Sequence, residues 1–309
     1  MNLATLNLQS ADEVIRQLTE GAHANRAAPC RHGSIDVIEA PGKLIATGDL
    51  HDNPLHLSKL VRAAKLDVED GTTVDADGTP LPHITLHEII HSPRLLNGMD
   101  FSYRALTRVA ALKAAFPTRV HTLLGNHELA QVQNAGIIKD GVRSVDVFND
   151  AVEYAFGDDA PRVLEAVGLF VYSMPIALRC HCTRADGGHA MDILCAHSLP
   201  GPAMMNRFDP TLLSRELTPA DYEPRTGSAH QMIWGRGYDA EQLEDLVERW
   251  GVNLFVLGHE KADNGITLVP PNAIVLASDH ERGVYLPIDL SNPPKPEECL
   301  ERVVSLAEA

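Results

Sequence analysis

Four short polar clusters, each directly after an apolar run, constrain the fold of this chain most strongly. The runs end near residues 47, 124, 195 and 257. A short apolar run bounded by turn residues is typical of a buried strand, so each cluster is expected at a strand's C-terminal end. Ligands bind at such ends in open α/β sheets. The pattern therefore predicts an α/β protein with a metal centre, and one with two metal ions. The side chains that would form it are Asp49, His51, Asn126, His197 and His259.

Composition restricts the class of partner. The 309 residues are 44% hydrophobic and 22% charged, which is ordinary for a globular domain, and the net charge is −16. A nucleic acid or an anionic membrane needs clustered Lys and Arg, so neither partner is expected. An anionic substrate is still compatible, because bound cations would set the local field. The five cysteines fit a reducing compartment, and without a signal peptide or a long apolar run the expected location is the cytoplasm.

The order of apolar runs predicts the architecture. Strands alternate with helices early in the chain, and strands cluster after residue 169, which predicts two packed sheets flanked by helices. Strands are predicted at 84–90 and 169–173, among others. A helix is predicted over 101–115, with Asp100 as its N-cap.

The same pattern predicts three segments. Residues 1–33 form an N-terminal helical extension, and residues 34–290 form the main domain. A polar, intermittently helical stretch at about 137–168 is expected to cap that domain. Residues 291–309 form a C-terminal tail with a Pro-rich joint and one short helix.

The polar clusters resemble the calcineurin-like metallophosphoesterase superfamily, in its phosphoprotein phosphatase and diadenosine tetraphosphatase branch. Residues 48–51 match the motif Gly-Asp-x-His, and residues 125–128 match Gly-Asn-His-Glu at every position. His197 and His259 resemble the two later single-histidine motifs. The resemblance extends over about 34–290, with the motifs in the right order. It implies a four-layer αββα sandwich of two mixed β-sheets flanked by helices.

The second motif of that family, Gly-Asp-x-x-Asp-Arg-Gly, is where the chain departs. Its nearest counterpart is the segment 87–92. Glu88 would replace the aspartate that bridges both metals. His91 would replace the aspartate that orients the catalytic histidine, and Ser92 would replace a phosphate-binding arginine. The alternative bridge is Asp100, but its position suits a helix cap, whereas Glu88 ends a predicted strand.

The resemblance also implies a ligand set and a cofactor. Carboxylate, imidazole and amide ligands suit two divalent ions, with Mn favoured and Fe or Zn as alternatives. Glu88 would be shared between the ions. By the same resemblance, Asp49 and His51 would hold one ion, and Asn126, His197 and His259 the other.

Three further residues are assigned to the chemistry. A water bridging the two metals would attack phosphorus, and His127 would protonate the leaving oxygen. Arg236 resembles a phosphate-binding arginine in a Trp-containing segment, and Arg94 is a second candidate for gripping phosphoryl oxygens. A neutral His91 stabilises charged His127 less than Asp would, so we expect a lower pKa for His127 and an acid-shifted optimum.

The predicted function is hydrolysis of a phosphomonoester or a phosphoanhydride. A phosphorylated Ser/Thr protein, a phosphorylated small molecule or a dinucleoside polyphosphate would be the substrate. The first alternative is a non-catalytic phosphate- or nucleotide-binding regulator on the same fold. The second is a phosphodiesterase, which is disfavoured because Lys261 stands where such enzymes usually carry a second histidine.

Other His and Cys residues are interpreted as structural. Cys180, His181 and Cys182, with His189 and Cys195 nearby, could suggest zinc, but alternation on a strand would put His181 opposite both cysteines. Strand packing is therefore the preferred interpretation. His87 and His121 are likewise interpreted as strand residues without a chemical role.

Overall fold

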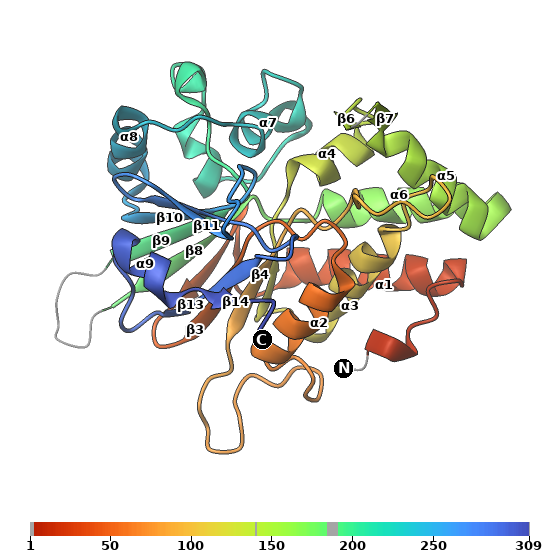
Figure 1. Ribbon diagram of the computed structural model, residues 1–309, viewed down its shortest axis with the longest axis horizontal. Helices are drawn as coiled ribbons and strands as arrows, with labels where there is room; N and C mark the ends of the chain where they lie inside the picture. Colours follow the sequence, from red (N-terminus) through yellow and green to blue (C-terminus); the bar gives the residue numbers. More distant parts are fainter. Residues whose placement is uncertain (1–2, 140, 184–190, 309) are drawn as a thin grey trace.

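Two mixed β-sheets form the centre of the computed structural model, which describes residues 3–139, 141–183 and 191–308 (Figure 1). In the larger sheet, three neighbouring pairs run parallel: β2–β8, β9–β10 and β10–β12. Within the described residues, its seven strands lie in the order β1 (Arg31–His32), β2 (Ile35–Glu39), β8 (Ala177–Cys182), β9 (Met191–Ala196), β10 (Leu254–Leu257), β12 (Ala273–Leu276) and β11 (Ile266–Val269).

The smaller sheet carries the first three site segments. Its middle strand β3 pairs parallel with β4, and β4 pairs parallel with β5. On its other side β3 pairs antiparallel with β13. The order is β14 (Val304–Ser305), β13 (Val284–Asp289), β3 (Lys43–Thr47), β4 (His83–Leu86) and β5 (Val120–Thr122). A separate hairpin pairs β6 (Ile138–Lys139) with β7 (Val142–Arg143).

One apolar core draws on strands of both sheets. It contains Leu44 of β3, Leu178 of β8, Val256 of β10 and Leu286 of β13, all nearly or fully buried. Side chains of a strand alternate between faces, so each sheet gives one set of residues to this core and another to its helix-covered face. The second core cluster joins those faces to the helices.

Helices flank the sheets, which confirms the predicted four-layer arrangement (Figure 1). Helix α1 packs on α3 and α6, and α9 packs on β11, β12 and β13. Ser10 caps α1, since its side chain accepts a hydrogen bond from the Glu13 backbone. The helices are α1 (Ala11–Ala27), α2 (Pro54–Ala63), α3 (Tyr103–Ala115), α4 (Asn126–Val132), α5 (Ser144–Phe156), α6 (Ala160–Val171), α7 (Ser228–Ile233), α8 (Ala240–Trp250) and α9 (Pro296–Arg302).

Three predicted elements differ from the structure. The strand expected over 84–90 is only β4 and ends at Leu86. The strand expected over 169–173 is wrong, because α6 continues to Val171 and buries Val163, Val167 and Phe170 at helical spacing.

The predicted N-cap of α3 is also wrong. Ser102, not Asp100, precedes the helix, and Asp100 accepts hydrogen bonds from the Ser102 backbone and hydroxyl instead. Aspartate oxygens commonly accept from a backbone N–H two residues onward, which explains how Asp100 can resemble a cap although it lies two residues before the N-cap.

The cysteine-containing strand packs as expected. Cys180 and Cys182 are fully buried in the core between the sheets, whereas His181 faces the other way and its ring contacts Asp192 at 2.9 Å. His189 lies outside the described residues. No group of metal-ligating side chains forms here within the part of the chain that the structure describes.

Both ends of the chain contact the main body. Near the N-terminus, α1 lies against α3 and α6, and near the C-terminus β14 extends the smaller sheet. The predicted boundaries of the extension, domain and tail stay predictions. Among the described helices, none combines the length and apolar character needed to cross a membrane.

Candidate metal centre

Five strand ends bring the candidate ligands together at one edge of the two sheets. Strands β3, β4 and β5 run parallel in one sheet, and β9 and β10 run parallel in the other. The residues that follow these ends therefore meet across the sandwich. Asp49 and His51 follow β3, His87 and Glu88 follow β4, Asn126 follows β5, His197 follows β9, and His259 follows β10.

His197 lies at the centre of the first group of ligand atoms. Its Nε2 is 2.9 Å from Asn126 Oδ1, 3.0 Å from His259 Nδ1 and 3.5 Å from Glu88 Oε2. All four side chains are buried. Imidazole, amide and carboxylate atoms in such proximity form a donor set suited to Mn, Fe or Zn.

The second group joins His51, Glu88 and His127, whose potential ligand atoms lie within 4.8 Å of one another. His51 Nδ1 is 3.1 Å from the Ile90 carbonyl oxygen, which only accepts. The proton of neutral His51 is therefore on Nδ1, and the lone pair of Nε2 is available to a metal.

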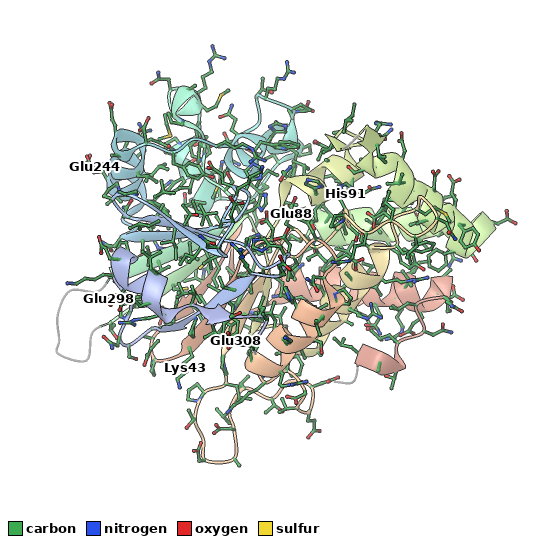
Figure 2. The ribbon with its side chains drawn as sticks, viewed as in Figure 1. Lys43, Glu88, His91, Glu244, Glu298 and Glu308 are labelled. Carbon is green, nitrogen blue, oxygen red and sulfur yellow. The ribbon has the colours of Figure 1, made fainter. Side chains whose placement is uncertain are left out.

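Glu88 belongs to both groups. Its Oε2 is 3.5 Å from His197 Nε2, and its Oε1 is 3.6 Å from His127 Nε2. Figure 2 shows Glu88 near the middle of the molecule. Burial, and then the nearby Glu128 carboxylate, raises the pKa of Glu88 well above its usual value. Ionising a buried carboxylate is costly unless positive charge lies nearby, so Glu88 suits a site that holds cations.

Asp49 lies on the other side of His197. Its Oδ1 is 3.4 Å from His197 Nδ1 and 3.5 Å from His87 Nδ1, and its two oxygens accept from the His259 backbone at 3.1 Å. Burial acts to raise the pKa of Asp49, but the neighbouring histidines outweigh it and the net shift is downward. The carboxylate is thus kept ionised, as a metal ligand must be.

Asp100, the alternative bridge, has other partners. Its Oδ2 accepts from the Ser92 backbone at 3.2 Å and from the Ser102 hydroxyl at 2.9 Å. Burial raises its pKa to about 6. The structure therefore brings Glu88, and not Asp100, into the group around His197.

His127 is held by a chain of side chains. His91 Nδ1 is 2.8 Å from His127 Nδ1, His91 Nε2 is 2.9 Å from Gln131 Oε1, and Gln131 donates to Asn149. Burial, followed by the charges of neighbouring histidines, lowers the pKa of His127 to about 2, and burial lowers that of His91 to about 4. The expected effect of His91 in place of an aspartate stays a prediction, because burial is the largest cause of the lowered pKa of His127.

Two arginines were candidates for binding phosphoryl oxygens. Arg236 is exposed and lies at the site, where Nη1 donates to the His259 carbonyl at 3.0 Å. Arg94 is exposed and donates to the Asp52 carbonyl in the loop after β3. Both guanidinium groups are thus tied to loops that carry ligands or their neighbours.

The loops that carry the site have a strained backbone. His51, Glu88, His91 and His259 have φ of 40°, 47°, 61° and 67°, and Asp52 has 51°. Non-glycine residues rarely adopt positive φ, and such residues cluster at functional sites when surrounding structure holds them there. Part of the holding structure is Glu128, which accepts from the Ile89 and Ile90 backbones at 2.6 and 3.2 Å.

Sequence reasoning missed His87 and Glu128. His87 was interpreted as a strand residue, but it is 1% exposed and its Nδ1 is 3.3 Å from His197 Nδ1. The signal for His87 was its place directly before Glu88. For Glu128 the signal was its position as the last residue of the Gly-Asn-His-Glu motif.

A cavity of about 240 Å³ opens beside His127. Its lining includes His91, Ser92, Ser144 and Asp100, and in the described residues it contains no Lys or Arg. The apolar part of the lining is Pro93, Leu95, Val142 and Val147.

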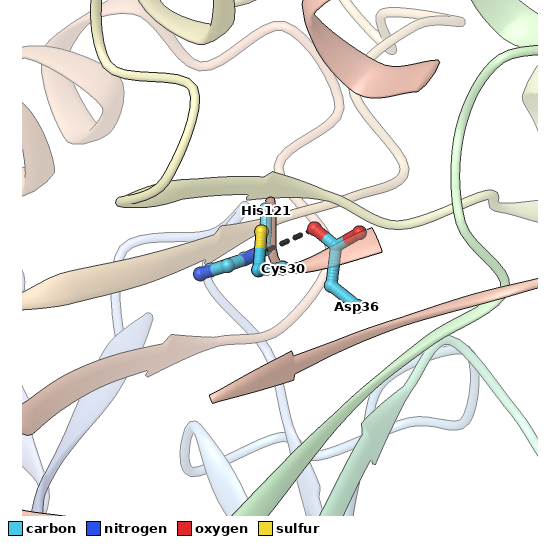
Figure 3. A group of neighbouring side chains, drawn as sticks. All are labelled: Cys30, Asp36 and His121. Atoms are coloured by element: carbon cyan, nitrogen blue, oxygen red, sulfur yellow. Dashed lines mark hydrogen bonds and ion pairs between the residues drawn. The ribbon is translucent and has the colours of Figure 1, made fainter. Parts of the chain in front are cut away.

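Another group with metal-ligand chemistry lies elsewhere, between the two sheets. His121 Nδ1 on β5 is 2.7 Å from Asp36 Oδ2 on β2, and Cys30 is close by (Figure 3). The ammonium of Lys113 and the guanidinium of Arg31 each lie 3.8 Å from Asp36. Burial and the Asp36 charge raise the pKa of Cys30 to about 11, so its thiol is a poor ligand at neutral pH. We interpret this group as a buried charge network that joins the sheets.

Two facing sheets flanked by helices, with polar side chains at the ends of five strands, form a fold that solved phosphatases share, and the predicted αββα fold is thereby confirmed. A protein serine/threonine phosphatase from Saccharomyces cerevisiae is similar with a TM-score of 0.62 and 16% identity over 91% of this chain and 83% of its own. A cold-active protein-tyrosine phosphatase of a psychrophile, Shewanella sp., is similar with a TM-score of 0.59 and 15% identity over 93% and 83%. No protein-family model and no curated protein matches the sequence.

Proposed function

We propose that the protein is a phosphatase that depends on two divalent metal ions and hydrolyses a phosphomonoester. The observation that carries the proposal is the convergence of Asn126, His197, His259 and Glu88 around one point, with Glu88 also reaching His127. Phosphatases that share the fold support the reaction class.

The ligands divide between two ions. Asp49, His51 and Glu88 would hold one ion, and Glu88, Asn126, His197 and His259 would hold the other. When bound, two such cations acidify a water and neutralise charge on the attacking and leaving oxygens. Manganese is our first choice, with iron or zinc as alternatives.

His127 and Arg236 would act on the substrate directly. In neutral His91 the proton is on Nε2, which faces Gln131 Oε1, so Nδ1 accepts from His127 Nδ1–H. Nε2 of His127 is then the nitrogen that would deliver a proton to the leaving oxygen. Arg236 is an exposed residue, and its guanidinium would bind phosphoryl oxygens, as a planar fork can contact two at once.

The cavity beside His127 favours a monoester over a dinucleoside polyphosphate. A polyphosphate leaving group carries several negative charges and needs cationic partners. The cavity instead offers apolar side chains, two serines and Asp100. An engineered apolar cavity of about 150 Å³ accepts benzene, so this space of about 240 Å³ would take an uncharged leaving group of at least that size.

The experiment compares p-nitrophenyl phosphate with bis-p-nitrophenyl phosphate, using protein stripped of metal and reloaded with Mn. We expect metal-dependent monoester turnover that Asp49→Asn abolishes, and little diester turnover. Faster turnover of the diester would favour a phosphodiesterase instead.

The second candidate is a non-catalytic regulator that binds phosphate or nucleotides. The observation behind it is the replacement of the expected Asp and Arg by His91 and Ser92. Bound metal without turnover of phosphopeptides, small phosphomonoesters or dinucleotides would support this regulator and contradict the phosphatase.

A further inference from the structure

His87 lies among the proposed metal ligands although the resemblance gives it no role. In the alignment of residues 87–92 with the second motif, it falls where the motif has glycine. We propose that His87 is a positioning residue that fixes the ring of His197, so that His197 presents Nε2 to a metal ion. This inference rests on the proposed two-metal function.

The hydrogen bond of His87 to Thr47 determines its tautomer. His87 Nε2 is 2.9 Å from the Thr47 carbonyl oxygen. A carbonyl oxygen only accepts, so Nε2 carries a proton. In the neutral ring Nδ1 then has a lone pair, which faces His197 Nδ1 at 3.3 Å.

The surroundings of His197 require a partner of this kind. Its Nε2 faces the atoms of Asn126, His259 and Glu88, and a nitrogen that ligates a metal must be unprotonated. When a metal ion is bound at Nε2, the proton of neutral His197 is on Nδ1. Metal-bound histidines almost always donate this second N–H to an acceptor that fixes tautomer and ring orientation.

Two acceptors are within reach of the proton on His197 Nδ1. Of the two, only His87 is not itself proposed as a metal ligand. Asp49 Oδ1 lies 3.4 Å from His197 Nδ1, but the Asp49 carboxylate already accepts from the His259 backbone and is assigned to the other metal. The rings of His87 and His197 meet edge to face, with 5.5 Å between centroids and an interplanar angle of 74°.

The neighbouring backbone leaves space for this arrangement. A Cβ at Gly258 would lie 2.6 Å from His87 Cε1 and 2.3 Å from Asp49 Oδ1. Glycine directly before His259 therefore lets a His87 ring and the Asp49 carboxylate share the space under His197. The histidine side chain at position 87 therefore fits because residue 258 has no side chain.

The test separates the two nitrogens of His87. His87→Asn keeps an acceptor near the position of Nδ1, whereas His87→Gln keeps a group near Nε2 that can reach Thr47 and lacks the acceptor near His197. Mn binding is measured by calorimetry on metal-stripped protein. Loss of a second partner of a ligating histidine typically weakens metal affinity about 10- to 100-fold, so we expect that loss at one of two sites in His87→Gln and a smaller loss in His87→Asn.

Three outcomes distinguish this inference from the function on which it rests. Wild-type protein that binds no Mn contradicts the proposed function itself. Wild-type protein with two bound Mn, and His87→Gln with the same two affinities, contradicts only the role of His87. Equal losses in both variants would make His87 a packing residue and also contradict the inference.

A measurement on the wild-type chain remains decisive if a variant does not fold. In protein loaded with zinc, nitrogen–proton correlations of the histidine rings report which nitrogen carries the proton. We expect His197 to be protonated at Nδ1 and His87 at Nε2. A proton on His87 Nδ1, or a His197 ring bound through Nδ1, would overturn the proposal.

Discussion

His91 Nδ1 lies 2.8 Å from His127 Nδ1, in the place where the related motif has an aspartate. Because His91 donates through Nε2 to Gln131, its Nδ1 can accept from His127 as an aspartate would. It differs from an aspartate in charge. A neutral acceptor fixes the orientation of His127 but stabilises its protonated form less.

His91→Asp should therefore move the pH dependence of turnover. A general acid must be protonated, so the rate falls as pH rises through its pKa. A carboxylate at position 91 would raise the pKa of His127, which burial now lowers to about 2 in the metal-free protein. We expect the alkaline limb of kcat to shift upward by about 1–2 pH units.

The matched control is His91→Asn, which removes the imidazole without adding charge. The alkaline limb of kcat against pH in His91→Asn should lie at the same pH as in the wild type. Superimposable profiles of wild type and His91→Asp would exclude an influence of residue 91 on the acid.

Gly125→Ala should damage the metal centre directly. A Cβ at Gly125 would lie 2.0 Å from Glu88 Oε2 and 2.5 Å from Glu128 Oε2, so Glu88 must move. We expect a loss of about 1–3 kcal/mol in the free energy of unfolding and at least about tenfold weaker Mn binding.

Gly168→Ala is the control for that substitution, measured by urea unfolding and calorimetry. Gly168 lies in α6, and beyond its chain neighbours and the helix's own nearby backbone, no atom of the described residues is within 4 Å of a Cβ built there. Alanine should raise the free energy of unfolding by about 0.5–1 kcal/mol without affecting Mn binding. Similar Mn affinity in the Gly125→Ala and Gly168→Ala variants would contradict the assignment of Glu88 as a metal ligand.

His83 should make stability depend on pH. Burial, followed by the charges of His121 and Arg119, lowers the pKa of His83 to about 3. The unfolded chain binds this proton near pH 6.5, so between pH 6.5 and 3 it binds more protons than the folded protein. The free energy of unfolding should then fall as pH drops, with up to about 1.4 kcal/mol per pH unit from this residue.

Urea unfolding at several pH values between 7 and 4 tests the effect. His83→Gln removes the titrating group, and its stability should fall less steeply than that of the wild type over the same range. Equal slopes would show that the folded protein protonates His83 as readily as the unfolded chain does.

Asp36→Asn should destabilise the protein without acting on the site. Burial acts to raise the pKa of Asp36, but the His121 hydrogen bond and the charges of Lys113 and Arg31 outweigh it and lower the pKa. Removing the carboxylate leaves buried cations without a counter-charge, which costs about 3–5 kcal/mol. Thermal unfolding measures the loss.

The double variant Asp36→Asn with Lys113→Met tests the cause. Removal of the unpaired ammonium should recover part of the lost stability, while turnover per folded molecule stays at the wild-type level. Strictly additive losses in the double variant would show that Lys113 is not paired with Asp36.

The parts of the fold that follow from local pattern were predictable. Apolar runs that end in Asp49, Asn126, His197 and His259 indicated strand ends, and parallel strands bring such ends together. The strand over 84–90 was wrong because the positive φ of Glu88 depends on tertiary contacts, among them the Glu128 carboxylate bound to the Ile89 backbone.

The remaining part of the site depends on contacts between distant segments. The position of His87 directly before Glu88 places it near the site, but it does not identify His197, 110 positions away, as the residue that its ring meets. The same holds for Asp36 and His121, which belong to different sheets. A buried histidine that packs and one that orients a ligand have the same sequence pattern.

A crystal structure of the protein soaked with Mn, with anomalous scattering measured at the Mn edge, tests the central claim most directly. We expect two peaks about 3.5–4 Å apart, both within bonding distance of Glu88. One peak should contact Asp49 and His51, and the other Asn126, His197 and His259. A single peak, peaks that Glu88 does not join, or no peak at these residues would contradict the two-metal centre.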